Sequence, residues 1–399
     1  MDHALPVMTS PRFSSLVGRN AGDHTAAWDI HYAAQAAQKR GEDVIILSVG
    51  DPDSDTPAPI VDAAIAALRQ GDTHYADVQG RLALRQDVAT RHQKRSGAAT
   101  GPQNVLMTAG AQNALFAMAL CLCEAGDEVL VPQPMYVTYT ASIEVTGATL
   151  VPVPAKQGGF RLDAEALAAR ITPRTRAIFL ATPSNPSGIV MTTEELAAVA
   201  DIAQAHNLWV VADEVYADLT FERPHVSIAG IPGMAERTVT ISSLSKSHAM
   251  TGWRVGWAVG PEPLIAHASK LALCMLYGMP GFVQAAASQA LRLDDGHVGG
   301  MRDLYRARRD AVLRRLRMLP LLDCIVPEAG MFLMIDVSRT GLTARDFAWG
   351  LLRTVGVSLL DGAAFGAETA RCVRLSLTVD EARLEETCDR IARYVATLA

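Results

Sequence analysis

Short apolar segments alternate with segments of helical character over most of the chain, from about residue 60 onward. Each apolar segment is four or five residues long, the length of a buried strand. The intervening segments repeat apolar residues at helical spacing or begin with good helix caps. This alternation predicts an α/β fold with a mainly parallel, seven-stranded sheet covered by helices. The expected strands are 105–108, 128–131, 149–153, 176–180, 208–212, 238–241 and 255–259, and the expected helices are 112–124, 163–169, 193–206 and 263–276.

The pattern changes after about residue 290. A long charged helix is expected at 301–319, followed by strands at 331–337 and 372–377 around a helix near 344–354. We expect this part to form a smaller α+β domain, and a helix at 25–41 with a strand at 44–49 to pack with it. The predicted division is an N-terminal arm with part of the small domain at 1–59, a large domain at 60–289 and a C-terminal small domain at 290–399.

Composition and charge exclude several classes of protein. Hydrophobic residues make up 49% of the chain and charged residues 20%, as in globular proteins. The net charge of −6 gives no basic surface for nucleic acid. The longest apolar run, at 114–123, is too short to cross a bilayer, and residues 1–12 lack a secretory signal pattern. We therefore expect a cytoplasmic protein with no membrane or nucleic-acid partner and no metal, and its six cysteines, which lie mostly in apolar segments, favour buried thiols over disulfides or zinc ligands.

The segment from Ser242 to Gly256 carries the strongest chemical signal. It places Lys246 among small hydroxylated residues at the end of an apolar strand, with Arg254 eight residues further on. A lysine forms a Schiff base with a carbonyl only as the neutral amine, and a neighbouring cation helps to lower its pKa. Arg254 could be that cation and could also bind a phosphate through two nitrogens. The segment points to pyridoxal 5′-phosphate as cofactor, and a lysine on a solvated loop is the alternative.

Two further motifs follow predicted strands, where a parallel sheet gathers its ligands. Gly110, Ala111 and Gln112 join a strand to a helix, and small residues there let backbone N–H groups face an anion. An ordinary strand-to-helix turn is the alternative. Asn185 lies in a Pro/Ser/Gly cluster that normally forms only a turn, yet its amide is placed to donate to a phenolate oxygen of the cofactor.

Three more side chains fit the same chemistry. Asp213 follows the very apolar segment at 208–212, where a carboxylate needs a partner such as a pyridinium nitrogen, unless it only caps a helix. Tyr216 could hydrogen-bond the ring hydroxyl from the same face. Tyr136 could stack on a flat heterocycle or belong to the core. Arg374 lies on an apolar strand and needs an anion, which is either a substrate α-carboxylate or a structural ion-pair partner.

Together these residues resemble the fold-type I, class I/II aminotransferases that depend on pyridoxal phosphate. The resemblance runs from about residue 12 to the end of the chain. Ser54 is a departure, because an aromatic residue is usual at this position, and it affects packing near the substrate more than chemistry. The matching motifs, in family order and approximate spacing, are Gly50-Asp51-Pro52-Asp53, Tyr75, Gly110 to Gln112, Asn185 to Gly188, Asp213, Tyr216, Ser243 to Lys246, Arg254 and Arg374.

The resemblance implies a role for each matching residue. Lys246 holds the cofactor covalently and carries catalysis together with Asp213, which pairs with the ring nitrogen, and Tyr216. The ring hydroxyl is bound by Asn185 and Tyr216. The phosphate is bound by Ala111, Gln112, Ser243 and Arg254, joined by Tyr75 from the neighbouring subunit of a homodimer. The resemblance adds three further cofactor-binding residues, Gly110, Tyr136 and Ser245. It also implies that the substrate carboxylate is bound by Gly50, Asn185 and Arg374.

Within the family, residues 27–32, 74–78, 245–257 and 274–278 look most like arginine–pyruvate transaminases. This implies ping-pong transfer of an amino group from L-arginine to pyruvate, in arginine catabolism. Specificity would come from a distal pocket near Trp28, Gln112 and Tyr277. A guanidinium there needs a carboxylate, for which Asp23 and Asp29 are the nearest N-terminal candidates.

Other functions are compatible with the same residues. The donor could be an aromatic or neutral amino acid or aspartate, because a Trp-lined pocket accepts apolar side chains. The same fold also supports carbon–sulfur β-lyases and decarboxylases. A regulatory ligand-binding module derived from an aminotransferase would carry an N-terminal DNA-binding segment, and only a short arm precedes the expected fold here.

Overall fold

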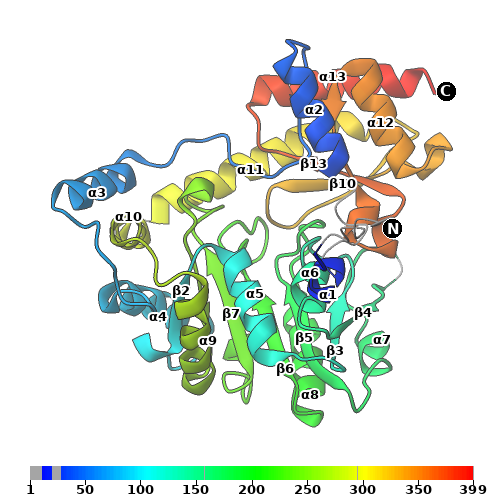
Figure 1. Ribbon diagram of the computed structural model, residues 1–399. Helices are drawn as coiled ribbons and strands as arrows, with labels where there is room; N and C mark the ends of the chain where they lie inside the picture. The colour runs from blue at the N-terminus through cyan, green and yellow to red at the C-terminus, as the bar shows by residue number, and fades with distance from the viewer. Residues whose placement is uncertain (1–10, 20–27, 157, 294, 399) are drawn as a thin grey trace, which may run out of the picture.

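The largest element of the molecule is a seven-stranded sheet. The computed structural model describes residues 11–19, 28–156, 158–293 and 295–398. The strand order is β2-β8-β7-β6-β5-β3-β4, and the sheet lies in the lower half of Figure 1. All seven predicted strands are present, with ends that differ by at most two residues. They are β2 (Val105–Thr108), β3 (Glu128–Pro132), β4 (Thr149–Val153), β5 (Thr175–Ala181), β6 (Trp209–Asp213), β7 (Thr238–Ser243) and β8 (Gly256–Val259).

The sheet is parallel except at β8, which runs antiparallel to both of its neighbours, β2 and β7. The predicted mainly parallel sheet is therefore confirmed, and the reversed strand is a feature that an apolar run does not encode. The reversal has a functional consequence. It brings the start of β8 to the edge where the other strands end, since Gly256 pairs with both Thr108 and Ser243.

Helices cover both faces of the sheet. In β3, Val129 and Val131 pack in one core with α5 (Ala111–Leu122), α6 (Tyr139–Glu144) and α9 (Glu262–Met275), whereas Leu130 packs on the other face with α7 (Ala164–Ala168) and α8 (Thr193–Ala205). Alternate side chains are thus buried on opposite faces, which is why these strands are continuous apolar runs in the sequence. A third core contains α3 (Ala58–Arg69), α4 (Leu82–Ser96) and α10 (Gly281–Arg292), which the sequence pattern did not predict.

A smaller α+β unit lies at the top of Figure 1. Its antiparallel sheet has the order β12-β13-β10-β9, and β1 (Ile45–Ile46) pairs in parallel with β11 (Val357–Ser358). The N-terminal residues Ile30 and Leu47 are buried in the same core as these strands. The elements are β9 (Asp323–Ile325), β10 (Phe332–Asp336), β12 (Leu360–Asp361), β13 (Cys372–Ser376), α2 (Asp29–Lys39), α11 (Asp295–Leu316), α12 (Ala344–Val355) and α13 (Glu381–Ala396). The exact domain boundaries stay a prediction.

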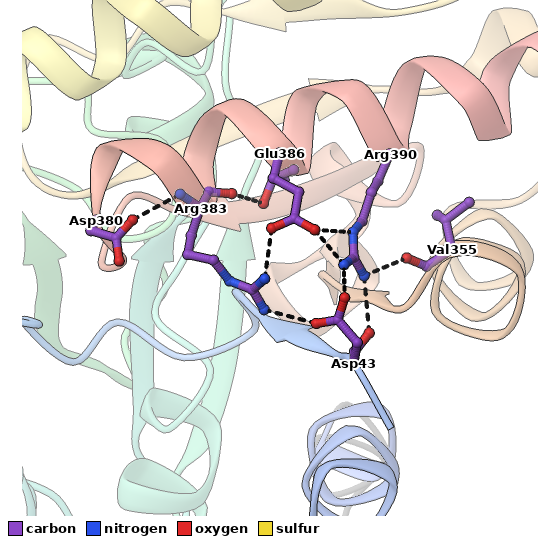
Figure 2. Close-up of polar contacts among 7 residues, drawn as sticks. Asp43, Val355, Asp380, Arg383, Glu386 and Arg390 are labelled. Carbon is purple, nitrogen blue, oxygen red and sulfur yellow. Dashed lines mark hydrogen bonds and ion pairs between the residues drawn. The ribbon is translucent and has the colours of Figure 1, made fainter. Parts of the chain in front are cut away.

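A network of charges fastens the N-terminal part of the chain to α13, as Figure 2 shows. The guanidinium of Arg390 donates to the carbonyl oxygens of Asp43 at 2.9 Å and of Val355 at 3.0 Å, and through Nε to Glu386 at 3.0 Å. Arg383 bonds both Glu386 and the Asp43 carboxylate. One buried arginine therefore joins the segment before β1, the end of α12 and α13, each contact being charge-assisted.

No helix within the described ranges is both long and apolar enough to span a membrane.

Candidate active site

The carboxyl ends of the parallel strands meet around a cavity of about 340 Å³. Ser243 ends β7 and Asp213 ends β6, next to Ala181, its register partner at the end of β5. Arg374 reaches the same cavity from β13, so both domains contribute to it. The lining contains most of the predicted site residues, namely Trp28, Gly50, Ala111, Gln112, Tyr136, Asn185, Asp213, Tyr216, Ser243, Ser245, Lys246, Arg254 and Arg374.

Lys246 faces the cavity without an ion-pair partner among the described residues. Its Nζ donates to the carbonyl oxygen of Gly50 at 2.5 Å. Burial lowers the pKa of Lys246 to about 8, Asp51 opposes the shift, and Arg374 and Arg254 add to it. The expected effect of Arg254 is present, but burial is the larger cause. The neutral, nucleophilic amine is therefore far more populated near neutral pH than in an exposed lysine.

The carboxylate of Asp213 is fixed by two donors. The hydroxyl of Tyr139 donates to Oδ2 at 3.0 Å, and the backbone N–H of Val215 donates to Oδ1 at 3.2 Å. Burial raises the pKa of Asp213 to about 6, and the two hydrogen bonds act in the opposite direction. Residues 215–218 form a turn, so Asp213 does not cap a helix. Its remaining free surface faces the cavity.

Arg374 is 3% exposed and has no carboxylate partner among the described residues. Its Nη1 donates to Asn185 Oδ1 at 2.9 Å and its Nη2 to the carbonyl oxygen of Ser48 at 2.8 Å, whereas its Nε has no hydrogen-bond partner. The guanidinium carbon lies 4.1 Å from the ring centroid of Phe332. Burial lowers the pKa of Arg374 to about 10. The structural ion pair is thus not formed within the described residues, and a buried cation in this state is suited to an anionic ligand.

The start of α5 forms an anion site together with Arg254. Gly110, which directly precedes α5, has a φ of +84°. A Cβ on Gly110 would lie 2.4 Å from Arg254 Nη2. A Cβ on Gly256 would lie 2.7 Å from the nitrogen of Ala111. No side chain caps α5, so its first N–H groups remain available. The two glycines therefore let the Arg254 guanidinium and the start of β8 approach the first residues of α5 closely, which brings a cation beside the uncapped helix N-terminus.

Other lining residues complete the walls. Ser243 and Ser245 are buried in the segment that joins β7 to Lys246. The side chain of Gln112 is held by Thr138 and Ser142, so it does not turn freely into the cavity.

Some predicted residues do not line the cavity of their own chain. Tyr75 and Tyr277 pack against each other, with ring centroids 4.7 Å apart, and are 85% and 54% exposed. Asp29 is exposed in the first turn of α2, although its neighbour Trp28 lines the cavity. Asp23 lies outside the described residues.

The cavity fits pyridoxal 5′-phosphate. This compound carries an aldehyde, a phosphate, a ring hydroxyl and a ring nitrogen on a flat heterocycle. The lining offers an amine, a helix N-terminus with an arginine, a tyrosine with an amide, and a carboxylate, respectively. The start of α5, which no side chain caps, lies beside the Arg254 guanidinium, and these donors together suit the phosphate. In the described part of the chain, no cluster of His, Cys, Asp and Glu side chains could hold a metal ion.

Comparisons with known proteins agree with this geometry. A model of the family described as aminotransferase class I and II matches residues 42–391. The chain is 53% identical over 388 residues to the arginine–pyruvate transaminase of Pseudomonas aeruginosa, covering 97% of this chain and 99% of that protein. It is 34% identical over 374 residues to an aspartate aminotransferase of Geobacillus stearothermophilus, covering 92% and 95%. A solved aspartate aminotransferase of Thermus thermophilus superposes with a TM-score of 0.91 at 32% identity, covering 96% of this chain and 100% of that one.

This chain therefore belongs to the class I and II aminotransferases, which depend on pyridoxal 5′-phosphate. Within that family it resembles the arginine–pyruvate transaminase named above, as its sequence indicated. The predictions of fold type, enzyme class and cofactor are confirmed.

The sequence did not reveal the residues that support the predicted ones. Tyr139 bonds Asp213, Ser48 bonds Arg374 through its carbonyl oxygen, and Phe332 lies against the Arg374 guanidinium. Each is distant in sequence from the residue that it supports. For Tyr139 alone the sequence offered a signal: it follows β3 three residues after Tyr136, so both tyrosines could lie near the same strand end and hence near the site.

Proposed function

We propose that this aminotransferase moves the α-amino group of L-arginine to pyruvate, giving L-alanine and the 2-oxo acid of arginine. The observation that carries this substrate assignment is the 53% identity, over 97% of the chain, to an arginine–pyruvate transaminase. Relatives described as aspartate or aromatic-amino-acid aminotransferases are 34% identical. We further propose that the enzyme works in the cytoplasm, in arginine catabolism.

The cofactor would be held by the groups that line the cavity. Lys246 would bind its aldehyde carbon, Asp213 its ring nitrogen, and Tyr216 with Asn185 its ring hydroxyl. Because Asn185 Oδ1 already accepts from Arg374, its Nδ2 remains to donate. The phosphate would lie at the start of α5 with Ser243, Ser245 and Arg254. When bound, the cofactor supplies a carbonyl carbon that takes up the amino group and a ring that withdraws electrons.

Lys246 would move the proton of the reaction. As a neutral amine it takes the proton from Cα of the bound amino acid, and its contact with Gly50 keeps Nζ at the cavity wall. Arg374 would hold the α-carboxylate beside Asn185, which fixes the orientation of the Cα–H bond. The 2-oxo acid leaves before pyruvate enters, and the same groups then act in reverse order.

The side chain of the donor would extend past Trp28. An indole is a good platform for a planar guanidinium, and it also accepts apolar side chains. Asp29 is exposed and does not line the cavity of its own chain.

A substrate panel tests the assignment. We expect kcat/KM with pyruvate as acceptor to be highest for L-arginine among arginine, lysine, methionine, phenylalanine and alanine. A preference for phenylalanine or methionine would refute arginine as the donor and leave the aminotransferase class intact. The β-lyase alternative predicts ammonia and pyruvate from a cysteine conjugate without any 2-oxo acid acceptor.

We also infer a homodimer in which Tyr75 reaches the phosphate of the neighbouring subunit. The inference is supported by the 85% exposure of Tyr75, beside an exposed Tyr277, outside the cavity of its own chain. Mixed dimers of Lys246→Ala subunits with Tyr75→Phe subunits should regain part of the activity, because the site that keeps Lys246 then receives an intact Tyr75 from its neighbour. Verified mixed dimers without activity would mean that each site is complete within one chain.

A further inference from the structure

Asp213 is not an isolated carboxylate, because Tyr139 of α6 touches it. The Tyr139 hydroxyl lies 3.0 Å from Asp213 Oδ2, although 74 residues separate the two in sequence. Tyr139 is 1% exposed and belongs to the core beneath α5. Asp213 is the one hydrogen-bond partner of this hydroxyl among the described residues.

The ring of Tyr139 has little freedom to move. It packs edge-on against Tyr136, with centroids 5.8 Å apart, and against Phe179, with centroids 6.4 Å apart. Tyr136 lines the cavity and Phe179 lies on β5, the strand next to Asp213. The hydroxyl is thus presented to the carboxylate from a fixed position.

We propose that Tyr139 is a positioning residue that keeps Asp213 ionised and turned so that its free surface faces the cavity. This inference rests on the proposed role of Asp213 as the partner of the cofactor ring nitrogen. Tyr139 itself does not line the cavity, so it acts through Asp213 and not on the cofactor.

The direction of the hydrogen bond follows from charge. Burial raises the pKa of Tyr139 well above its usual value, and the charge of Asp213 adds to the shift, so the hydroxyl keeps its proton and donates. Donation to a carboxylate stabilises the ionised form and opposes the burial that raises the pKa of Asp213. The other titratable groups near this carboxylate are Glu214, Tyr136 and Tyr216. Within the described ranges, Tyr139 is the only residue whose side chain donates a hydrogen bond to this carboxylate.

The test uses the holoenzyme reconstituted with cofactor that carries ¹⁵N in its ring, because the ¹⁵N chemical shift reports the protonation of that nitrogen. Four proteins are compared: wild type, Tyr139→Phe, Asp213→Asn and the double variant. Tyr139→Phe keeps the ring and removes only the hydroxyl. Tyr394→Phe, in the core of the smaller domain, is the matched control for loss of a buried tyrosine hydroxyl.

We expect Tyr139→Phe to weaken proton binding at the ring nitrogen about tenfold, the usual effect of one hydrogen bond to a charged group. The dissociation constant of pyridoxal 5′-phosphate from the apoenzyme should rise by a similar factor, and the rise should grow as pH falls toward 6. In the Asp213→Asn background, Tyr139→Phe should change neither quantity. Tyr394→Phe should behave as wild type.

Three results would overturn the proposal. A ring-nitrogen titration unchanged in Tyr139→Phe would show that the hydroxyl does not act on Asp213. An equal effect in the presence and absence of the Asp213 carboxylate would show that Tyr139 has only a structural role. If Asp213→Asn itself left the ring nitrogen unchanged, the proposed role of Asp213 would fail first, and the inference about Tyr139 would fail with it.

Discussion

Two buried arginines of the smaller domain have opposite surroundings. Arg390 on α13 and Arg374 on β13 are 7% and 3% exposed. Arg390 meets the carboxylates of Glu386 and Asp43 and two carbonyl oxygens (Figure 2). Among the residues that the structure describes, Arg374 donates only to an amide oxygen and a carbonyl oxygen, and Phe332 lies against its guanidinium.

The electrostatics of the two arginines differ accordingly. Its acidic partners raise the pKa of Arg390 against the effect of burial, whereas burial lowers the pKa of Arg374 to about 10. A cation whose counterions come from the chain holds the fold together. A cation buried without one is kept for a ligand, since leaving it unpaired serves no structural purpose and costs stability. Lys246 belongs to the second kind as well.

The largest effect is expected at Lys246. Lys246→Ala should retain some cofactor through the phosphate contacts but lose transamination by roughly 10⁴-fold, the upper range for an acid–base group. Borohydride reduction of the wild type should fix the cofactor on Lys246, as detected by peptide mass spectrometry. Lys270→Ala, which changes an exposed lysine on α9, is the matched control and should be fully active. A label on Lys270 or Lys156 would contradict the assignment.

The next largest effect is expected at Asp213, where a substitution should change both turnover and the stability of the apoenzyme. Asp213→Asn should lower turnover by about 100-fold or more, because a preorganised charge contributes roughly 3 kcal/mol or more. The apoenzyme of the same variant should be more stable than the wild type by about 1–3 kcal/mol near pH 8, because it no longer buries a charge.

The pH dependence of this stability gain follows from the raised pKa. The folded pKa of Asp213 is about 6, above its ordinary value of 3.8, so its contribution to stability is complete below about pH 4 and is lost as pH rises through 6. The difference in urea unfolding between Asp213→Asn and wild-type apoenzyme should therefore vanish at low pH. A wild-type apoenzyme that is more stable than the variant at pH 8 would mean that Asp213 is a structural residue.

The contrast between the two arginines can be tested by the same substitution at each. Arg374→Lys should raise KM for the amino acid by about 10–100-fold through loss of the two-nitrogen contact, and it should cost less in unfolding than Arg390→Lys because no carboxylate loses its partner. Arg390→Lys should leave KM unchanged and cost roughly 1–3 kcal/mol in urea unfolding, because two carboxylates and two carbonyl groups lose contacts. An exchange of these outcomes would show that the absence of a counterion does not distinguish ligand sites from structural ones.

The smallest expected effect concerns pH and Lys246. Because its pKa is about 8, the neutral amine is about a tenth of the total at pH 7. The rate of covalent cofactor capture by the apoenzyme, followed by absorbance in stopped flow, should rise about tenfold from pH 7 and level off above pH 8 to 9. A rate that still climbs steeply near pH 10 would indicate an ordinary exposed lysine.

Much of the fold could be predicted from the sequence because strands buried on both faces form apolar runs. The same pattern placed Lys246, Asp213 and Asn185 at strand ends. It could not show the reversed direction of β8, because parallel and antiparallel strands have similar composition. The helices α3, α4 and α10 also escaped prediction, since none of them begins with a side chain that caps its N-terminus.

Most of the supporting contacts of the site could not be predicted from the sequence. The bond from Tyr139 to Asp213 and the bonds of Arg374 depend on segments brought together only by the complete fold. The surface pairing of Tyr277 with Tyr75 likewise arises from two distant loops. Local patterns identify residues with chemical capacity, whereas tertiary packing decides which of them meet.

The most direct test of the account is the fate of the amino nitrogen. Purified holoenzyme is incubated with L-arginine labelled with ¹⁵N at the α-amino group and with pyruvate, and the products are measured by NMR. The account predicts L-alanine that carries the label, in amounts equal to the arginine consumed, and none with Lys246→Ala. Release of the label as ammonium, or unlabelled alanine, would contradict it.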